Sequence, residues 1–172
     1  NRQMTAVPAT DKEALFSPQV REEIDRWVEK YPAEWKQSAC MAALTIVQDD
    51  NGGWLTDELM DRVAAYLDMP PIAVYEVATF YSMYELKPVA RNNVAICTNI
   101  SCMLMGSQSI VDHLQNKLGI KLGESTKDGR IYLKQEEECL AACCGAPMMM
   151  VDHEYFENLT PDRVDEILEG LE

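Results

Sequence analysis

The chain has only two histidines, no C-x-x-C pair and no surplus of basic residues, and each absence excludes a class of protein. The net charge of −14 argues against binding to nucleic acid and to anionic membranes, because both require a basic face. Without C-x-x-C, a thioredoxin-type dithiol and zinc knuckles are disfavoured. Neither His113 nor His153 lies at ligand spacing from a cysteine, which excludes a Rieske centre.

Long apolar runs and nucleotide-binding motifs are missing as well. No run approaches the roughly 20 residues of a membrane-spanning helix, and residues 1–16 are polar and charged, unlike a secretory signal. Neither a glycine-rich dinucleotide fingerprint nor a Walker loop occurs, so the chain itself is not expected to bind a nucleotide. At 172 residues it can build an ordinary core without disulfide staples.

Six cysteines are present, and four of them form two close pairs separated by a long stretch of ordinary chain. The first pair has C-x4-C spacing and follows the strand-like run 94–96. The second has C-x3-C spacing and lies in a loop entered from the strand-like segment 130–134. Two loops at the same end of a sheet could each supply one thiol pair to a metal centre. The four candidate ligands are Cys97, Cys102, Cys139 and Cys143.

Spacing leaves three interpretations of this quartet open. A [2Fe-2S] cluster is favoured, because plant-type ferredoxins share the C-x4-C, although here the third cysteine comes much later and C-x3-C replaces C-x2-C. Zinc is less favoured, because all-cysteine zinc sites mostly use C-x2-C knuckles. The third interpretation is a disulfide framework. It is less favoured, because a chain without a secretory signal is expected to keep its cysteines reduced, and reduced thiols can serve as metal ligands.

The other two cysteines are assigned structural roles. Cys40 lies in the small, apolar helical segment 39–44 and is predicted to be a buried hydrophobe. Cys144 directly follows Cys143, and neighbouring side chains in an extended loop diverge. We therefore predict Cys143 as the ligand and Cys144 as a packing residue that could substitute for it. The small residues 145–147 are expected to let backbone N–H groups approach the sulfurs.

Residues 1–90 are predicted to form a bundle of short helices, because apolar residues recur at helical spacing between proline and glycine breaks. Nothing in this half has catalytic spacing, and its aromatic residues are expected in a core or an interface. The predicted helices run from Ser17-Pro18 to Tyr31, from Ala33 to Asp49, from Thr56 to Leu67 and from Ile72 to Tyr84.

Residues 91–172 are predicted to mix strands and helices in the order β-α-β-β-α, a reduced thioredoxin-like layout. The fold class is therefore α+β, an N-terminal helical bundle followed by a thioredoxin-like domain. Both histidines are expected at the surface or a boundary, without a catalytic partner. The predicted elements are a strand over 94–98, a helix over 105–118, strands over 131–133 and 148–151, and a helix over 162–171 that is capped by Thr160-Pro161.

These features together resemble one known family, the thioredoxin-like [2Fe-2S] subunit of the NADH-oxidising module of respiratory complex I. The resemblance is carried by the two thiol pairs, by Gly145-Ala146-Pro147 leading into the Met148 strand, by Val77–Tyr81 and by the Lys127–Arg130 turn, and it covers nearly the whole chain. It implies a thioredoxin-like [2Fe-2S] ferredoxin domain over residues 91–172 and a partner-docking bundle over residues 1–90.

The resemblance also implies a function. Cys97, Cys102, Cys139 and Cys143 would hold one low-potential [2Fe-2S] cluster that exchanges single electrons with FMN. The FMN and NADH would bind only to a partner flavoprotein subunit, within the larger peripheral arm of complex I. The chain would act as an enzyme only as a subunit of this complex, the NADH:quinone oxidoreductase of the respiratory chain. Its place would be cytoplasmic and peripheral at the inner membrane in a bacterium, or on the matrix side of a mitochondrion. Alternatives are the diaphorase subunit of an NAD-linked formate dehydrogenase or NAD-reducing hydrogenase, or a zinc-stabilised interaction module.

Overall fold

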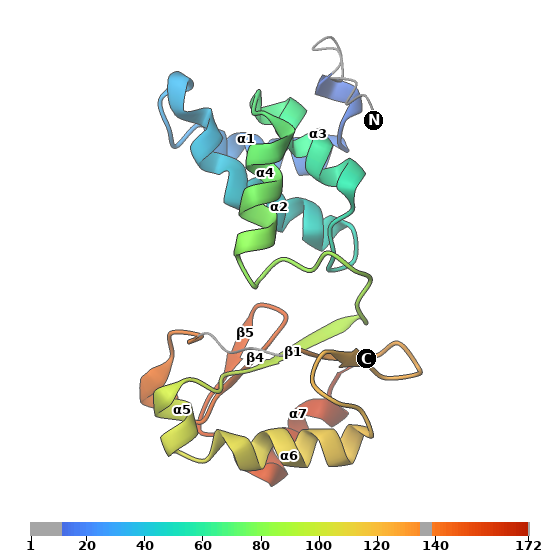
Figure 1. The fold of residues 1–172 in the computed structure, drawn as a ribbon, viewed down its shortest axis with the longest axis vertical. Helices are drawn as coiled ribbons and strands as arrows, with labels where there is room; N and C mark the ends of the chain where they lie inside the picture. Colours follow the sequence, from blue (N-terminus) through green and yellow to red (C-terminus); the bar gives the residue numbers. More distant parts are fainter. Residues whose placement is uncertain (1–11, 135–138, 172) are drawn as a thin grey trace. The chain divides into compact units, whose positions relative to one another are not determined.

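The computed structural model describes residues 12–134 and 139–171, which divide into two compact units, Asn1–Pro88 and Val89–Glu172 (Figure 1). The first unit is helical and the second combines helices with one sheet. The described part of the chain contains no helix that is both long and apolar enough to cross a bilayer.

The first unit consists of short helices that pack on one another. In the contacts between elements, α1 lies against α2, α2 against α3, and α3 against α4. The elements are η1 (Lys12–Ala14), α1 (Pro18–Val28), η2 (Ala33–Ala39), α2 (Cys40–Asp50), α3 (Asp57–Leu67) and α4 (Pro71–Phe80).

Capping side chains set the starts of α1 and α3, as predicted. Ser17 Oγ accepts a hydrogen bond from the N–H of Val20 at 3.3 Å, with Pro18 in the first turn. Thr56 Oγ1 accepts one from the N–H of Leu59 at 3.1 Å. Each cap satisfies a backbone donor that the helix itself leaves free. The apolar faces of these helices form one core, which includes Ile24, Leu44, Leu55, Val63, Leu67 and Val74.

Two predictions for this unit were wrong in detail. The helix expected over 33–49 is divided, because Trp35 adopts non-helical dihedral angles and residues 33–39 form a 3-10 helix. Helix α4 ends at Phe80 instead of Tyr84, since the following segment turns back onto α2. There the buried Tyr84 donates to the Met41 carbonyl at 2.9 Å, and these tertiary contacts outweigh four further residues of helix.

The second unit holds a five-stranded sheet. Its elements are β1 (Asn92–Ile96), α5 (Ile100–Leu104), α6 (Ser107–Leu118), β2 (Glu124–Ser125), β3 (Ile131–Lys134), η3 (Cys143–Gly145), β4 (Met149–Val151), β5 (Glu154–Phe156) and α7 (Pro161–Glu169).

The strand order β2-β3-β1-β4-β5 places β1 in the centre. It pairs in parallel with β3, with Asn92 opposite Ile131, and antiparallel with β4, with Ile96 opposite Met149. Because β1 and β3 are parallel, their carboxyl ends lie at the same edge of the sheet. Cys97 directly follows β1 at this edge, and the second thiol pair comes after β3 in the sequence.

Helices α6 and α7 cover one face of the sheet (Figure 1). Leu114 of α6 and Val164 of α7 are fully buried with Val94, Ile131 and Met149 of the strands. Thr160 caps α7 by accepting the N–H of Arg163 at 3.2 Å, and Pro161 lies in the first turn, as predicted. This packed layer is the rigid support for the loops at the sheet edge.

Three elements of this unit were not predicted. Helix α5 lies in the segment expected to be loop, and α6 begins at Ser107 after a break at the left-handed Gly106. Strands β2 and β5 were missed because each has only two or three residues and exposed side chains, too short for an alternating pattern to show.

Candidate metal centre

The first thiol pair is built into the core. Cys97 directly follows β1, and its N–H donates to the Met148 carbonyl of the neighbouring chain segment at 3.2 Å. The chain then turns at Asn99, whose side chain accepts the N–H of Ile100 at 2.9 Å and starts α5. Cys102 lies on the inner side of this helix, so that Cys97 and Cys102 are only 2% and 1% exposed.

The second pair lies on an irregular, exposed loop. The Sγ atoms of Cys139 and Cys143 are 3.3 Å apart, and both residues are exposed. Between them Ala141 adopts a left-handed backbone with φ of 64°, which alanine rarely does. In this conformation its N–H donates to Cys139 Sγ at 3.4 Å. Cys143 then begins the 3-10 turn η3.

The structure brings the two pairs to one place. Cys97 and Cys102 form a small apolar cluster with Ala142, Ala146 and Met148, which come from the second loop and from the chain leading into β4. The Cys97 thiol also interacts with the thiols of Cys102 and Cys139. Two loops that are far apart in the sequence therefore present four thiols to each other.

Helix α5 also lies against the second loop. Cys102 of this helix packs in the same apolar cluster as Ala142 and Ala146, which flank η3. This contact was not predicted, and no sequence signal points to it, because it depends on how α5 lies against η3.

The electrostatics differ between the pairs. Burial, followed by a hydrogen bond with Cys97, raises the pKa of Cys102 to about 11. The N–H of Ala141, followed by the Cys143 thiol, lowers the pKa of Cys139, whereas Cys139 raises the pKa of Cys143. The pKa values of the two exposed thiols are therefore shifted in opposite directions. A metal must displace the protons of its thiol ligands, and burial raises the pKa of Cys102, so that this thiol holds its proton more tightly.

The geometry fits a centre with two metal ions. Two sulfurs at about 2.3 Å from one tetrahedral metal lie about 3.8 Å apart, so the 3.3 Å between Cys139 and Cys143 needs little adjustment to hold one metal. Among residues 12–134 and 139–171, no three His, Cys, Asp or Glu side chains are arranged around a single ion position. In a [2Fe-2S] cluster each iron requires two thiolate ligands, and the four thiols are arranged as two such pairs.

The turn after η3 is held by close packing. A Cβ atom at Gly145 would overlap the side chain of Glu157, so this position requires glycine. The Gly145 carbonyl accepts the N–H of Asn158 at 2.7 Å, and its own N–H donates to the Ala142 carbonyl at 3.0 Å. We expected the N–H groups of this turn to approach the sulfurs, but those of Gly145 and Ala146 are used within the turn, and it is the N–H of Ala141 that contacts a thiol.

The remaining cysteines have different environments. Cys40 is buried in α2, and burial raises its pKa to about 11, which confirms the prediction of a buried hydrophobe. Cys144 is exposed, so the prediction that it packs in an interior was wrong: the 3-10 turn leaves it at the surface beside Cys143. The structure places Cys143, and not Cys144, next to Cys139.

His113 has a partner that the sequence did not reveal. Its Nε2 lies 2.6 Å from Asp165 Oδ1, which also accepts from Lys117 Nζ at 2.9 Å. The group joins α6 to α7, and it lowers the pKa of Asp165. It is a contact between two helices and includes none of the four candidate thiols.

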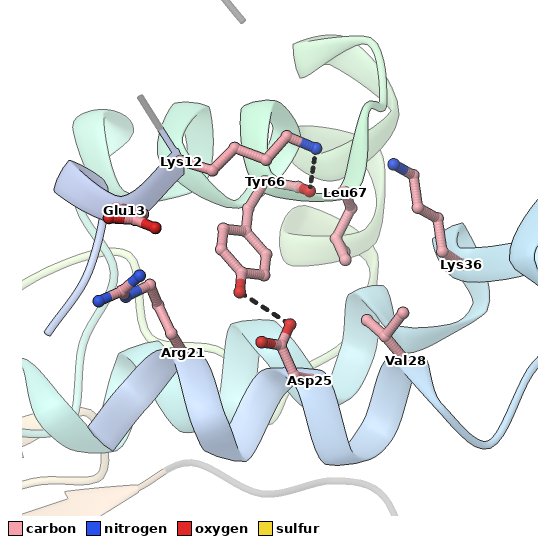
Figure 2. Close-up of a pocket in the computed structure, with 8 residues that line it drawn as sticks. All are labelled: Lys12, Glu13, Arg21, Asp25, Val28, Lys36, Tyr66 and Leu67. Carbon is pink, nitrogen blue, oxygen red and sulfur yellow. Dashed lines mark hydrogen bonds between the residues drawn. The ribbon is translucent and has the colours of Figure 1, made fainter. Parts of the chain in front are cut away.

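A separate cavity of about 290 Å³ lies in the helical unit, lined by residues that include Lys12, Asp25, Lys36 and Tyr66 (Figure 2). Tyr66 donates its hydroxyl proton to Asp25 Oδ1 at 2.7 Å, while Lys12 Nζ donates to the Tyr66 carbonyl at 3.0 Å (Figure 2). Both acidic and basic side chains line this cavity.

Comparison with known proteins gives a consistent result. The profile of the thioredoxin-like [2Fe-2S] ferredoxin family matches residues 24–172. The E-type subunit of the NADH-quinone oxidoreductase of Rickettsia bellii is 44% identical over 144 residues, which cover 84% of this chain and 86% of the relative. The corresponding subunit of Rickettsia conorii is 42% identical over 145 residues, with the same coverage.

Among solved structures, an NAD+-reducing [NiFe]-hydrogenase in the H2-reduced state is similar, with a TM-score of 0.60 and 19% identity. The match covers 73% of this chain but only 21% of the hydrogenase chain. At this identity the likeness concerns the fold. It agrees with the α+β, thioredoxin-like fold class expected from the sequence.

Proposed function

This chain belongs to the thioredoxin-like [2Fe-2S] ferredoxin family, and from that membership we propose that it is the electron-transfer subunit of an NADH:quinone oxidoreductase. In this role it holds one [2Fe-2S] cluster and exchanges single electrons with the FMN of a partner flavoprotein subunit that binds NADH. The observation that carries the proposal is the convergence of two thiol pairs at one sheet edge.

We assign Cys97 and Cys102 to one iron and Cys139 and Cys143 to the other. The cluster, when bound, supplies one-electron exchange, which a flavin needs in order to pass on the two electrons of a hydride one at a time. The residues of the chain contribute position and environment. The buried pair is held by β1 and α5, and the Ala141 N–H donates to Cys139, a contact that favours the thiolate.

The two units are assigned different tasks in this proposal. The cluster-binding task belongs to residues 91–172, and we assign docking to the larger assembly to residues 1–90. Ile72 and Phe80 of α4 support the docking role, because both are large apolar side chains that are mostly exposed in this chain. Exposed apolar surface of this kind is typical of protein interfaces. In a respiratory complex the chain would lie peripherally at the membrane.

An alternative parent complex shares the same subunit type. The fold likeness to an NAD+-reducing [NiFe]-hydrogenase would suit a diaphorase subunit of such an enzyme. The much higher identity to NADH-quinone oxidoreductase subunits, over most of both chains, favours the respiratory assignment.

The test is isolation of the untagged complex from its native source. We expect the chain to copurify with an FMN-containing subunit, and the preparation to reduce a quinone analogue with NADH. The isolated chain, prepared without oxygen, should contain about two irons and, when reduced, give one S = 1/2 EPR signal. Stoichiometric zinc without iron would support the zinc-stabilised interaction module instead, and copurification with hydrogenase or formate dehydrogenase subunits would reassign the parent complex.

A further inference from the structure

The loop that carries the second thiol pair is fastened at its base by a segment that comes later in the chain. Strands β4 and β5 are antiparallel neighbours, with Met149 opposite Phe156. A hairpin of this kind returns the chain to where it started, so residues 157–159, which we call the clasp, come back beside residues 145–147. The turn after Cys143 therefore meets the segment between β5 and α7.

Two backbone hydrogen bonds join the clasp to the turn. The N–H of Asn158 donates to the Gly145 carbonyl at 2.7 Å, and the N–H of Leu159 donates to the Pro147 carbonyl at 2.9 Å. Asn158 has a left-handed backbone with φ of 52°, a conformation that asparagine adopts more readily than most residues. Strand β5 ends before this residue, so these bonds fasten the turn and are not part of the sheet.

The side chain of Glu157 lies across the turn at Gly145. Its Cβ, Cγ and Cδ atoms all lie 2.6 Å or less from the place that a Cβ atom of residue 145 would take. Three consecutive carbons at such similar distances mean that the side chain lies along the glycine and does not meet it end on. Gly145 is buried although Glu157 is exposed, so the carbons of Glu157 act as the cover of this turn.

The clasp is itself anchored in the packed layer under the sheet. Leu159 is buried in the core that β1, β3 and β4 form with α6 and α7. The next residue, Thr160, caps α7. Glu157 is therefore held next to a buried residue and a helix start, and it can hold the turn in its turn because closely packed parts of a protein transmit displacement.

The covered turn is directly coupled to the second thiol pair. Cys143 begins η3 and Gly145 ends it, and the Gly145 N–H donates to the Ala142 carbonyl at 3.0 Å. A displacement of Gly145 therefore moves Cys143, whose Sγ lies 3.3 Å from that of Cys139. The loop's own hydrogen bonds give it its shape, while the clasp sets where the shaped loop lies. Metal ligands need such support, because a site held about 1 Å too loosely loses its function.

We propose that Glu157 is a positioning residue for the metal centre: by lying across Gly145 it holds the turn after Cys143 and keeps this thiol beside Cys139 for its iron. The role belongs to the carbons that cover the glycine, and not to the charge at their end. A smaller residue at position 157 would leave the turn uncovered, and a larger one at position 145 would push the cover away. The inference rests on the proposed [2Fe-2S] site, but not on the choice of parent complex.

The experiment measures how fast the full-length chain, loaded with its cluster and kept without oxygen, loses its visible absorption to an iron chelator. Glu157→Ala should release the cluster about fivefold faster or more, because Cγ and Cδ no longer cover the turn. Glu157→Gln keeps every carbon and should stay within about twofold of the unaltered chain. Glu154→Ala removes the same side chain from an exposed position of β5 and should also stay within about twofold.

A double-mutant cycle tests the contact itself. Gly145→Ala should release the cluster about fivefold faster or more, because the new Cβ displaces Glu157. Gly170→Ala is the matched control, since the nearest atom to a Cβ there is the Ile167 carbonyl oxygen at an ordinary 3.5 Å. In a chain that already carries Glu157→Gly, Gly145→Ala should accelerate release less. Glycine is needed at 157 because the Cβ of Glu157 is among the overlapping atoms.

Two further readouts separate positioning from general stability. Glu157→Ala should alter the EPR g-values of the reduced chain, Glu157→Gln should not, and the two cluster-free chains should unfold at the same urea concentration. Equal release from Glu157→Ala and the unaltered chain, or equally fast release from Glu157→Gln and Glu157→Ala, would overturn the inference and leave the proposed function intact. So would an equal effect of Gly145→Ala in both backgrounds, or a urea midpoint that falls in Glu157→Ala alone. If the unaltered chain holds zinc and no iron, the proposed function itself fails.

Discussion

The two thiol-bearing loops begin at the same edge of one sheet, yet they are built in opposite ways. The first is ordinary structure, a strand end, a turn capped by Asn99 and a short helix, and it buries both thiols. The second contains a left-handed alanine and a 3-10 turn, and it exposes both thiols. The first loop is fixed by the core, while the second is fixed largely by its own hydrogen bonds.

This difference assigns different tasks to the two loops. A buried pair holds its position through packing, so it defines where a cluster sits. An exposed pair can be reached by an incoming metal ion, and the N–H of Ala141 lowers the pKa of Cys139, whereas Cys139 raises the pKa of Cys143. We infer that the first loop provides the anchor and the second provides access, for metal during assembly and for electrons afterwards.

The largest expected effect comes from removing an anchor thiol. Cys102→Ala should lose the cluster, because one iron then lacks a ligand and the apolar side chains packed around this position offer no other. Cys40→Ala removes an equally buried thiol from α2 and should keep the cluster, at a cost of about 1 kcal/mol or less in unfolding free energy. Iron per chain and the EPR signal of the reduced protein check both. Equal iron content in the two variants would contradict the ligand assignment.

The next largest effect tests the access loop. Cys143→Ser should lose or strongly perturb the cluster, because Cys143 is the thiol in contact with Cys139. Cys144→Ser should leave iron content and EPR line shape unchanged, since that exposed thiol is not the one placed beside Cys139. The two variants form a matched pair of adjacent positions. The reverse ranking would move the fourth ligand to Cys144.

A smaller effect is expected at Ala141, where the backbone of the access loop is strained. The left-handed conformation costs roughly 1–2 kcal/mol for a residue with a Cβ, and more for a β-branched one. Ala141→Gly should therefore keep the cluster and retain it longer on mild heating, whereas Ala141→Val should release it faster. Loss of the visible absorption with time measures both rates. Indistinguishable rates for the two variants would show that the loop does not depend on this conformation.

The smallest effect concerns the support beneath both loops. Asp165 accepts hydrogen bonds from His113 and then Lys117, which lower its pKa below its usual value of 3.8. Because the folded pKa is depressed, this stabilisation is present above pH 3.8 and is lost as the pH falls through the lower folded pKa. Asp165→Asn should lower the urea midpoint at pH 5, and the difference from the unaltered chain should shrink below pH 3.8. Iron content at pH 7 should not change, since neither thiol pair touches this group.

Local signals in the sequence were sufficient for much of the framework. Ser17, Thr56 and Thr160 cap helices where expected. Each cap is a hydrogen bond between residues three positions apart, so it depends little on how distant segments pack. The apolar spacing of α1, α3 and α6 predicted their buried faces for the same reason. The spacing of the cysteines, with the surrounding motifs, was enough to indicate the family.

Other features needed the folded chain. Helix α4 ends at Phe80 because Tyr84 finds a partner on α2, and His113 gains Asp165 from a helix 52 residues away. Such contacts join segments with no relation in the sequence, so no local pattern could predict them.

By itself, the sequence determined the residue types and spacing of the thiols, the starts of the capped helices α1, α3 and α7, and the family to which the chain belongs. Only the tertiary structure decided that one thiol pair is buried and the other exposed, that Ala141 turns left-handed, and that α5 directs Cys102 inward and Leu104 outward. The reason is physical: ligand spacing and capping act within a few residues, whereas burial and backbone strain arise when distant segments compete for the same space.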